Sequence, residues 1–220
     1  MRLIRVMCSG RVDLEFIFRA FANRQDGVFI GGCRLNECNY VTHGNYDALS
    51  NVYLGRKLLG YIGVNPERLH IEFMSGAEGN LLAEATDTFS GKIKALGPLG
   101  KDEGLDEHQM TLRLNAVRRL VPYIKLVERE RLRVPVKSAQ AYQAFFHSSA
   151  TDRLFGELIR DKLTLSQILS LLKEKPLSTK DISARLQLNP SEVAKHMNDA
   201  SRQGLVRYVE DRKSYTLAVT

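Results

Sequence analysis

The sequence has no tryptophan, only three cysteines and no long hydrophobic run. A membrane-spanning helix needs about 20 mostly apolar residues in succession, so we expect no membrane span. Met1 leads directly into a strand-like stretch rather than a secretory signal, and we therefore expect a cytoplasmic protein. Because an odd number of cysteines cannot form a closed set of disulfides, Cys8, Cys33 and Cys38 are expected to be metal ligands or buried thiols.

The chain also lacks an evenly basic surface, although its formal net charge is +7. Much of the positive excess falls in residues 112–137, which contain eight Lys or Arg against two acidic residues. Residues 164–220 contain nine basic and six acidic residues. A basic segment between two domains fits docking on an acidic protein at least as well as it fits contact with nucleic-acid phosphates.

Residues 1–98 have the alternation of short strands and amphipathic helices that is typical of a parallel α/β sheet. The pattern predicts strands at 2–7, 28–30 and 69–74, and helices at 13–23, 45–61 and 81–96. The third helix is expected to stop at Gly97-Pro98, a common pairing at helix ends. Three parallel strands with right-handed helical crossovers are the simplest solution, so we predict a small flavodoxin-like domain.

Residues 99–163 are predicted to be a helical connector. An apolar stripe runs along its first helix at steps of four and three residues: Met110, Leu114, Val117, Val121 and Ile124. This stripe needs a surface to pack against. Two candidates remain open at this point, a second helical stretch at residues 138–162 of the same chain and a separate partner protein.

Residues 164–220 are predicted to fold as a winged helix, with three short helices followed by a hairpin. Ser178 and Asp181 form a capping pattern at the second helix, and Asn189-Pro190 marks the start of the third. In a DNA-binding winged helix the third helix enters the major groove. The residues expected to contact DNA or a partner are Lys195, Arg202, Arg212 and Lys213. Acidic Glu192 and Asp199 oppose phosphate approach, which favours docking over DNA binding.

The three cysteines are expected to meet at one edge of the sheet. Cys8 follows the first predicted strand and Cys33 follows the second, and the carboxyl ends of parallel strands form the edge where such folds bind ligands. Cys38 lies in the same loop as Cys33. Grouped thiolates suit zinc or an iron-sulfur cluster. The spacing by itself leaves buried structural thiols as an alternative.

A family resemblance follows from five motifs that occur in order. They are Ile4 to Asp13 (IRVMCSGRVD), Asp26 to Tyr40 (Asp26-Gly27-Val28, then Gly31-Gly32-Cys33 and Cys38-Asn39-Tyr40), Gly44-Asn45-Tyr46, Gly63 to Leu69 (GVNPERL) and Ser75 to Gly79 (SGAEG). Over residues 2–98 the sequence resembles the iron-sulfur delta subunit, or MvhD type, of methyl-viologen-reducing hydrogenase. The resemblance implies a 2Fe-2S protein with Cys8, Cys33 and Cys38 as ligands. It also implies electron transfer from a hydrogenase or another donor to the flavoprotein subunit of a heterodisulfide-reductase-type complex.

The sequence departs from this family at its beginning. Family members start with a further strand and helix that carry a Cys-x-x-Cys pair, and this sequence starts after that element. A cysteine-only 2Fe-2S site needs four thiolates, and three are present. Three explanations remain open: the fourth ligand is His43 or comes from a partner subunit, the true start lies upstream, or the cluster is lost and the domain is a docking scaffold.

We expect no catalytic residues, because no nucleophile lies beside a general base in any recognisable pattern. Glu78, at the end of the third predicted strand, is expected to be a solvated carboxylate or helix cap, or else to hydrogen-bond near the cysteines. The first functional hypothesis is an electron-transfer or adaptor subunit. The alternative is a redox- or metal-responsive winged-helix regulator of transcription.

Overall fold

The computed structural model describes residues 1–40 and 42–218, which form two compact units, Met1–Arg153 and Leu154–Thr220. The first unit contains η1 (Ser9–Arg11), α1 (Leu14–Ala22), β1 (Val28–Gly32), α2 (Asn45–Tyr61), η2 (Pro66–Arg68), β2 (Leu69–Phe73), α3 (Gly79–Leu96), α4 (Glu107–Arg131) and α5 (Ala139–Phe146). α6 (Ser149–Phe155) spans the division. The second unit continues with a π-helical turn (Gly156–Arg160), α7 (Asp161–Glu174), α8 (Thr179–Leu186), α9 (Pro190–Arg202), β3 (Val206–Val209), η4 (Glu210–Arg212) and β4 (Ser214–Leu217).

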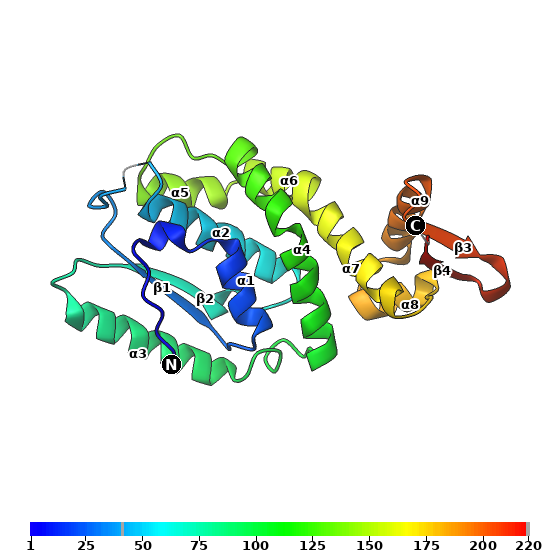
Figure 1. The fold of residues 1–220 in the computed structure, drawn as a ribbon, viewed down its shortest axis with the longest axis horizontal. Helices are drawn as coiled ribbons and strands as arrows, with labels where there is room; N and C mark the ends of the chain where they lie inside the picture. Colours follow the sequence, from blue (N-terminus) through cyan, green and yellow to red (C-terminus); the bar gives the residue numbers. More distant parts are fainter. Residues whose placement is uncertain (41, 219–220) are drawn as a thin grey trace. The chain divides into compact units, whose positions relative to one another are not determined.

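A two-stranded parallel sheet lies at the centre of the first unit. β1 and β2 pair in register from Val28–Leu69 to Gly32–Phe73. α1 and α2 cover one face of this sheet and α3 crosses the other (Figure 1). Glycines allow the close packing, because a Cβ on Gly27 would lie 2.6 Å from Ile93 of α3 and one on Gly55 of α2 would lie 2.8 Å from Leu69. The mixed α/β fold class is therefore confirmed, with a smaller sheet than predicted.

The predicted first strand, residues 2–7, is wrong. These residues form no regular structure, and Leu3 and Met7 are 83% and 88% exposed. Their sequence has strand propensity, but a strand exists only where a neighbouring strand supplies hydrogen-bond partners. Within the described chain, the backbone of residues 1–7 makes no hydrogen bond to the sheet. The sheet consequently has two strands instead of three.

α1 is the element that buries the apolar stripe of α4, so neither of the two partners considered from the sequence is the main one. All five stripe residues are buried. Two ion pairs border this contact, from Arg118 to Glu15 at 3.4 Å and from Lys125 to Asp13 at 2.6 Å. Part of the basic charge of residues 112–137 thus holds the first unit together instead of facing a partner.

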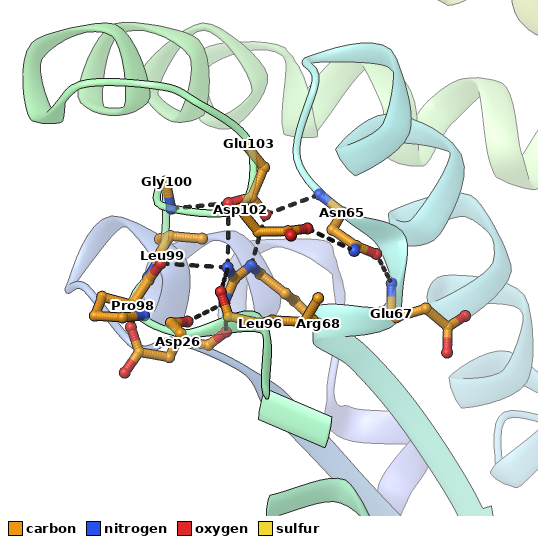
Figure 2. Close-up of polar contacts among 11 residues, drawn as sticks. Asp26, Asn65, Glu67, Arg68, Leu96, Pro98, Leu99, Gly100, Asp102 and Glu103 are labelled. Atoms are coloured by element: carbon orange, nitrogen blue, oxygen red, sulfur yellow. Dashed lines mark hydrogen bonds and ion pairs between the residues drawn. The ribbon is translucent and has the colours of Figure 1, made fainter. Parts of the chain in front are cut away.

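A buried arginine joins the start of β2 to the end of α3. Arg68 has no exposed surface, and its guanidinium binds Glu103, with Nε 2.6 Å from Oε1. It also donates to four backbone carbonyls, those of Asp26, Leu96, Gly97 and Pro98 (Figure 2). Three of these carbonyls lie at the C-terminal end of α3, where a helix leaves acceptors unpaired. Arg68 therefore caps α3 through a tertiary contact.

The second unit is a winged helix, as predicted. α8 begins with a capping box between Ser178 and Asp181, and α9 begins at Pro190 after the cap Asn189. β3 and β4 pair antiparallel, and an isolated bridge from Leu177 to Tyr215 adds a third segment. The end of the predicted hairpin, residue 219, lies outside the described residues.

Candidate thiol site and winged-helix surface

The three cysteines come together beside the carboxyl end of β1, as the sequence predicts. Cys8 immediately precedes η1, Cys33 immediately follows β1, and Cys38 lies in the loop before α2. The sulfurs of Cys8 and Cys38 are 3.9 Å apart. Cys33 also interacts with Cys38 through its side chain. Three thiols from segments up to 30 residues apart are thus neighbours.

Close backbone contacts between glycines make this convergence possible. A Cβ on Gly10 would lie 2.5 Å from the carbonyl oxygen of Gly44. A Cβ on Gly44 would lie 2.5 Å from the sulfur of Cys38, and one on Gly32 would lie 2.8 Å from Oγ of Ser9. A side chain at any of these positions would push the loops apart, so the glycines are needed where the chain passes closest to itself.

Gly44→Ala is expected to destabilise the chain by about 1–3 kcal/mol, because its methyl group would overlap the Cys38 sulfur and the loop would have to move. Denaturant unfolding measures the loss, and the rate of Cys38 modification by a thiol reagent reports the displaced loop. The matched control is Gly91→Ala on α3, where a Cβ meets nothing within 4 Å. That control should gain up to about 1 kcal/mol. Equal behaviour of the two variants would contradict this account.

The three thiols differ in their tendency to ionise. Burial raises the pKa of both Cys8 and Cys33 above its ordinary value. Burial also acts on Cys38, but hydrogen bonds from the backbone of Tyr40 and Asn45 outweigh it and lower the pKa of that thiol. Cys38 lies against Gly44 at the N-terminus of α2, where the helix dipole also favours negative charge. It is therefore the thiol best placed to be a thiolate ligand or nucleophile.

Asn45 is a site residue that the sequence reasoning did not single out. Its side chain is buried and its amide donates to the carbonyls of Cys33 at 2.9 Å and Arg34 at 2.7 Å. The same amide nitrogen lies 3.6 Å from the Cys33 sulfur. The sequence signal was its position in Gly44-Asn45-Tyr46, between the cysteine loop and the first turn of α2.

Glu78 connects the loop that carries Cys33 and Cys38 to the segment after β2. Its carboxylate pairs with Arg34, the residue after Cys33, with Nε 3.0 Å from Oε2. The same oxygen accepts the backbone N–H of Ser75 at 2.7 Å. Of the roles expected for Glu78, hydrogen bonding near the cysteines is the one observed, and its side chain does not cap α3.

His43 is on the surface, with 86% of its side chain exposed, and its Nδ1 lies 3.1 Å from Oδ2 of Asp47. In residues 1–40 and 42–218, no three His, Cys, Asp or Glu side chains are placed together as a ready metal site. The donor chemistry of three neighbouring thiols, one with a lowered pKa, nevertheless fits a soft metal or an iron-sulfur group. The thiolates are one fewer than a cysteine-only 2Fe-2S site requires.

The basic residues predicted for the winged helix are on its surface. Lys195 lies on α9 and Arg202 is exposed at its end, and Arg212 and Lys213 are exposed at the turn between β3 and β4. Lys213 ends η4 in the left-handed conformation, with a φ of 46°. In the described ranges, no helix is both long enough and apolar enough to cross a membrane.

Comparison with known proteins identifies relatives of both ends of the chain. Residues 1–97 match the family model of the methyl-viologen-reducing hydrogenase delta subunit, and residues 164–208 match that of the bacterial regulatory protein arsR family. The iron-sulfur subunit of the F420-non-reducing hydrogenase of Archaeoglobus profundus is 47% identical over 97 residues, which is 44% of this chain and 70% of that protein. The corresponding vhc iron-sulfur subunit of Methanococcus voltae is 43% identical over 97 residues, 44% of this chain and 67% of the relative.

A larger relative contains the same region as a small part of its length. It is a subunit of the ferredoxin/F420H2-dependent CoB-CoM heterodisulfide reductase of Methanosarcina acetivorans, and it is 38% identical over 101 residues. This match covers 46% of the chain described here and 13% of the relative. Through its first 97 residues, the chain belongs to the family of the methyl-viologen-reducing hydrogenase delta subunits.

Proposed function

We propose that the chain is a non-catalytic electron-transfer or adaptor subunit of a hydrogenase- or heterodisulfide-reductase-type assembly. The names of the relatives support this role, since they are subunits of both kinds of enzyme. The observation that carries the proposal is the meeting of Cys8, Cys33 and Cys38 beside the carboxyl end of β1. Ligands bind at this edge in parallel α/β folds.

In this proposal the three thiolates hold a 2Fe-2S cluster, with a fourth ligand from His43 or a partner subunit. A 2Fe-2S cluster takes up and releases single electrons. The chain contributes the ligands and their surroundings. Backbone hydrogen bonds favour the ionised form of Cys38, and Asn45 holds the loop that carries Cys33. The electrons come from a hydrogenase or another donor and go to a flavoprotein subunit.

Anaerobic purification with iron and sulfide analysis tests this proposal, together with the EPR spectrum of the reduced chain. About two irons and two sulfides per chain with a 2Fe-2S signal would establish an electron carrier. A chain that stays without iron after reconstitution, yet co-purifies with a co-expressed heterodisulfide reductase flavoprotein, would be an adaptor only. A chain that neither binds iron nor associates with that flavoprotein would remove the proposal.

The second candidate is a redox- or metal-responsive DNA-binding regulator. It is favoured by the arsR-family match and by the basic residues of α9 and the wing. The test is fluorescence anisotropy with DNA from upstream of the chain's own gene and with a scrambled duplex, at several salt concentrations. Specific binding that is weakened at least tenfold by Lys195→Ala with Arg202→Ala supports regulation. Weak binding that is equal for both duplexes rejects it.

A further inference from the structure

The outer edge of β2 has unpaired backbone groups. Along a strand, successive residues turn their N–H and C=O groups to opposite sides. The N–H of Met74 donates to the carbonyl of Gly32 in β1 at 2.9 Å. The peptide groups of His70 and Glu72, four and two residues earlier, therefore also face β1. The carbonyl of Leu69 accepts from Nε of Arg56 at 2.9 Å, on the opposite side.

Ile71 and Phe73 therefore turn their peptide groups outward, like Leu69. In the part of the chain that the structure describes, neither residue's N–H or C=O has a hydrogen-bond partner. Two donors and two acceptors alternate along this edge beyond Arg56. Native proteins normally cover or blunt such an edge, because it is a template for another strand.

Two hollows flank this edge, one on each face of the sheet. The first, about 350 Å³, lies between β2 and α3 and includes Phe73, Leu81, Ala85 and Phe89 in its lining. The second, about 230 Å³, lies between β2 and α2 and is lined partly by Leu35, Val52 and Phe73. A strand added beside β2 would direct alternate side chains to opposite faces, one set toward each hollow. The edge therefore offers main-chain pairing together with side-chain pockets.

The charges near the edge indicate what kind of strand fits. Glu72 and Glu84 line the first hollow. Its lysine, Lys92, is paired with Glu67 at 2.5 Å. Nε2 of His70 lies 3.3 Å from Oε2 of Glu72, so the lining of this hollow has two carboxylates, Glu72 and Glu84, against one imidazole. A second copy of this chain pairing antiparallel about Glu72 would set the two Glu72 carboxylates opposite each other, which is unfavourable. A strand with a basic residue at that position is complementary.

We propose that the outer edge of β2 is a docking site for an extended segment of a partner protein. The segment adds a third strand through Ile71 and Phe73, places apolar side chains in both hollows and sets a lysine or arginine near Glu72 and Glu84. Leu35, two residues after Cys33, lines the second hollow. A partner docked here lies beside the cysteine loop.

The test uses the isotope-labelled, metal-free full chain, so its result does not depend on whether the thiols bind iron. The probe is a capped eight-residue peptide in which valine alternates with lysine and threonine. Binding is expected to slow hydrogen exchange at the Ile71 and Phe73 amides at least tenfold, with little change at His70 and Glu72. If the hydrogen-exchange rates of the Ile71 and Phe73 amides do not change at millimolar peptide concentration, the proposal is overturned.

Two N-methylated versions of the peptide separate strand pairing from apolar sticking. One carries methyl groups on alternate amides of one register and the other on those of the opposite register. Because only one set of amides faces β2, one peptide should lose at least tenfold in affinity while the other binds like the parent. Equal binding by both, or equal loss in both, would overturn strand addition.

A charge variant tests the preferred partner. Glu72→Lys is expected to weaken the lysine-containing peptide at least threefold, whereas Glu157→Lys, the same change on an exposed residue of the second unit, should leave binding unchanged. Equal affinity of the unchanged chain and of Glu72→Lys for this peptide would contradict the preference for a strand with a basic residue. Sedimentation of the free chain addresses the other occupant: a dimer with protected Ile71 and Phe73 amides would replace the partner with a second copy.

Discussion

Arg68→Ala is expected to destabilise the first unit by about 3–5 kcal/mol, the cost of removing one partner from a buried ion pair. The variant leaves Glu103 as a buried carboxylate without its cation, and four backbone carbonyls lose a donor. Since domains are stable by only about 5–15 kcal/mol, this unit should be close to unfolding. Urea unfolding followed by NMR signals of the first unit measures the effect.

Lys92→Ala provides the matched control for this prediction. This variant also breaks an ion pair between a basic residue and a glutamate, but here both partners, Lys92 and Glu67, are about half exposed. Exposed pairs contribute about 1 kcal/mol or less. Arg68→Lys keeps the charge but has too few donors in the right directions, so an intermediate loss is expected. A loss of less than about 1 kcal/mol for Arg68→Ala would show that the network is not what holds this unit.

The same network predicts a dependence of stability on pH. Burial opposes ionisation of Glu103, but Arg68 and the N–H of Asn65 outweigh it and lower the pKa of this carboxyl below 4.5. A lowered folded-state pKa stabilises the fold above the unfolded value, and this stabilisation is lost as the pH falls through the folded value. The free energy of unfolding should therefore decrease as the pH is lowered below about 4.5. This decrease should be less steep in Glu103→Gln.

Cys38→Ser is the prediction with the largest expected effect on the proposed site. Iron in the anaerobically reconstituted chain should fall from about two per chain to near zero, because the thiolate with the lowered pKa is lost. Cys8→Ser and Cys33→Ser should act in the same direction. Thermal unfolding of the metal-free variants is the control, and it should change little for an exchange of sulfur for oxygen at these partly exposed positions.

His43→Gln separates the two sources proposed for the fourth ligand. If His43 is that ligand, the variant loses iron or shifts its EPR spectrum. If a partner supplies the ligand, His43→Gln leaves both unchanged and full iron loading appears only when the partner is present. Iron that stays bound in all three cysteine variants would contradict the proposed ligands altogether.

Local patterns in the sequence predicted most elements correctly. The spacing of the apolar residues was enough to predict α2 with its end at Tyr61. Gly97 was enough to predict where α3 ends. The winged helix followed from Ser178, Asp181 and Asn189-Pro190, whose capping contacts are all within a few residues. The meeting of the cysteines was also predicted, but the reason held only for Cys33, which follows β1 at the carboxyl edge of the sheet; Cys8 reaches that edge without a strand before it.

Contacts between distant residues decided the rest. Residues 2–7 have the composition of a strand but no paired neighbour, and no property of the segment itself could reveal this. The partner of the α4 stripe was α1 because burial depends on which surfaces meet. Arg68, Asn45 and Glu78 have polar side chains that look solvent-exposed in a sequence. Local spacing and capping residues were enough to predict most helices and the family. The burial of Arg68 and Asn45 depended on the tertiary fold, because their hydrogen-bond partners lie 11 to 42 residues away.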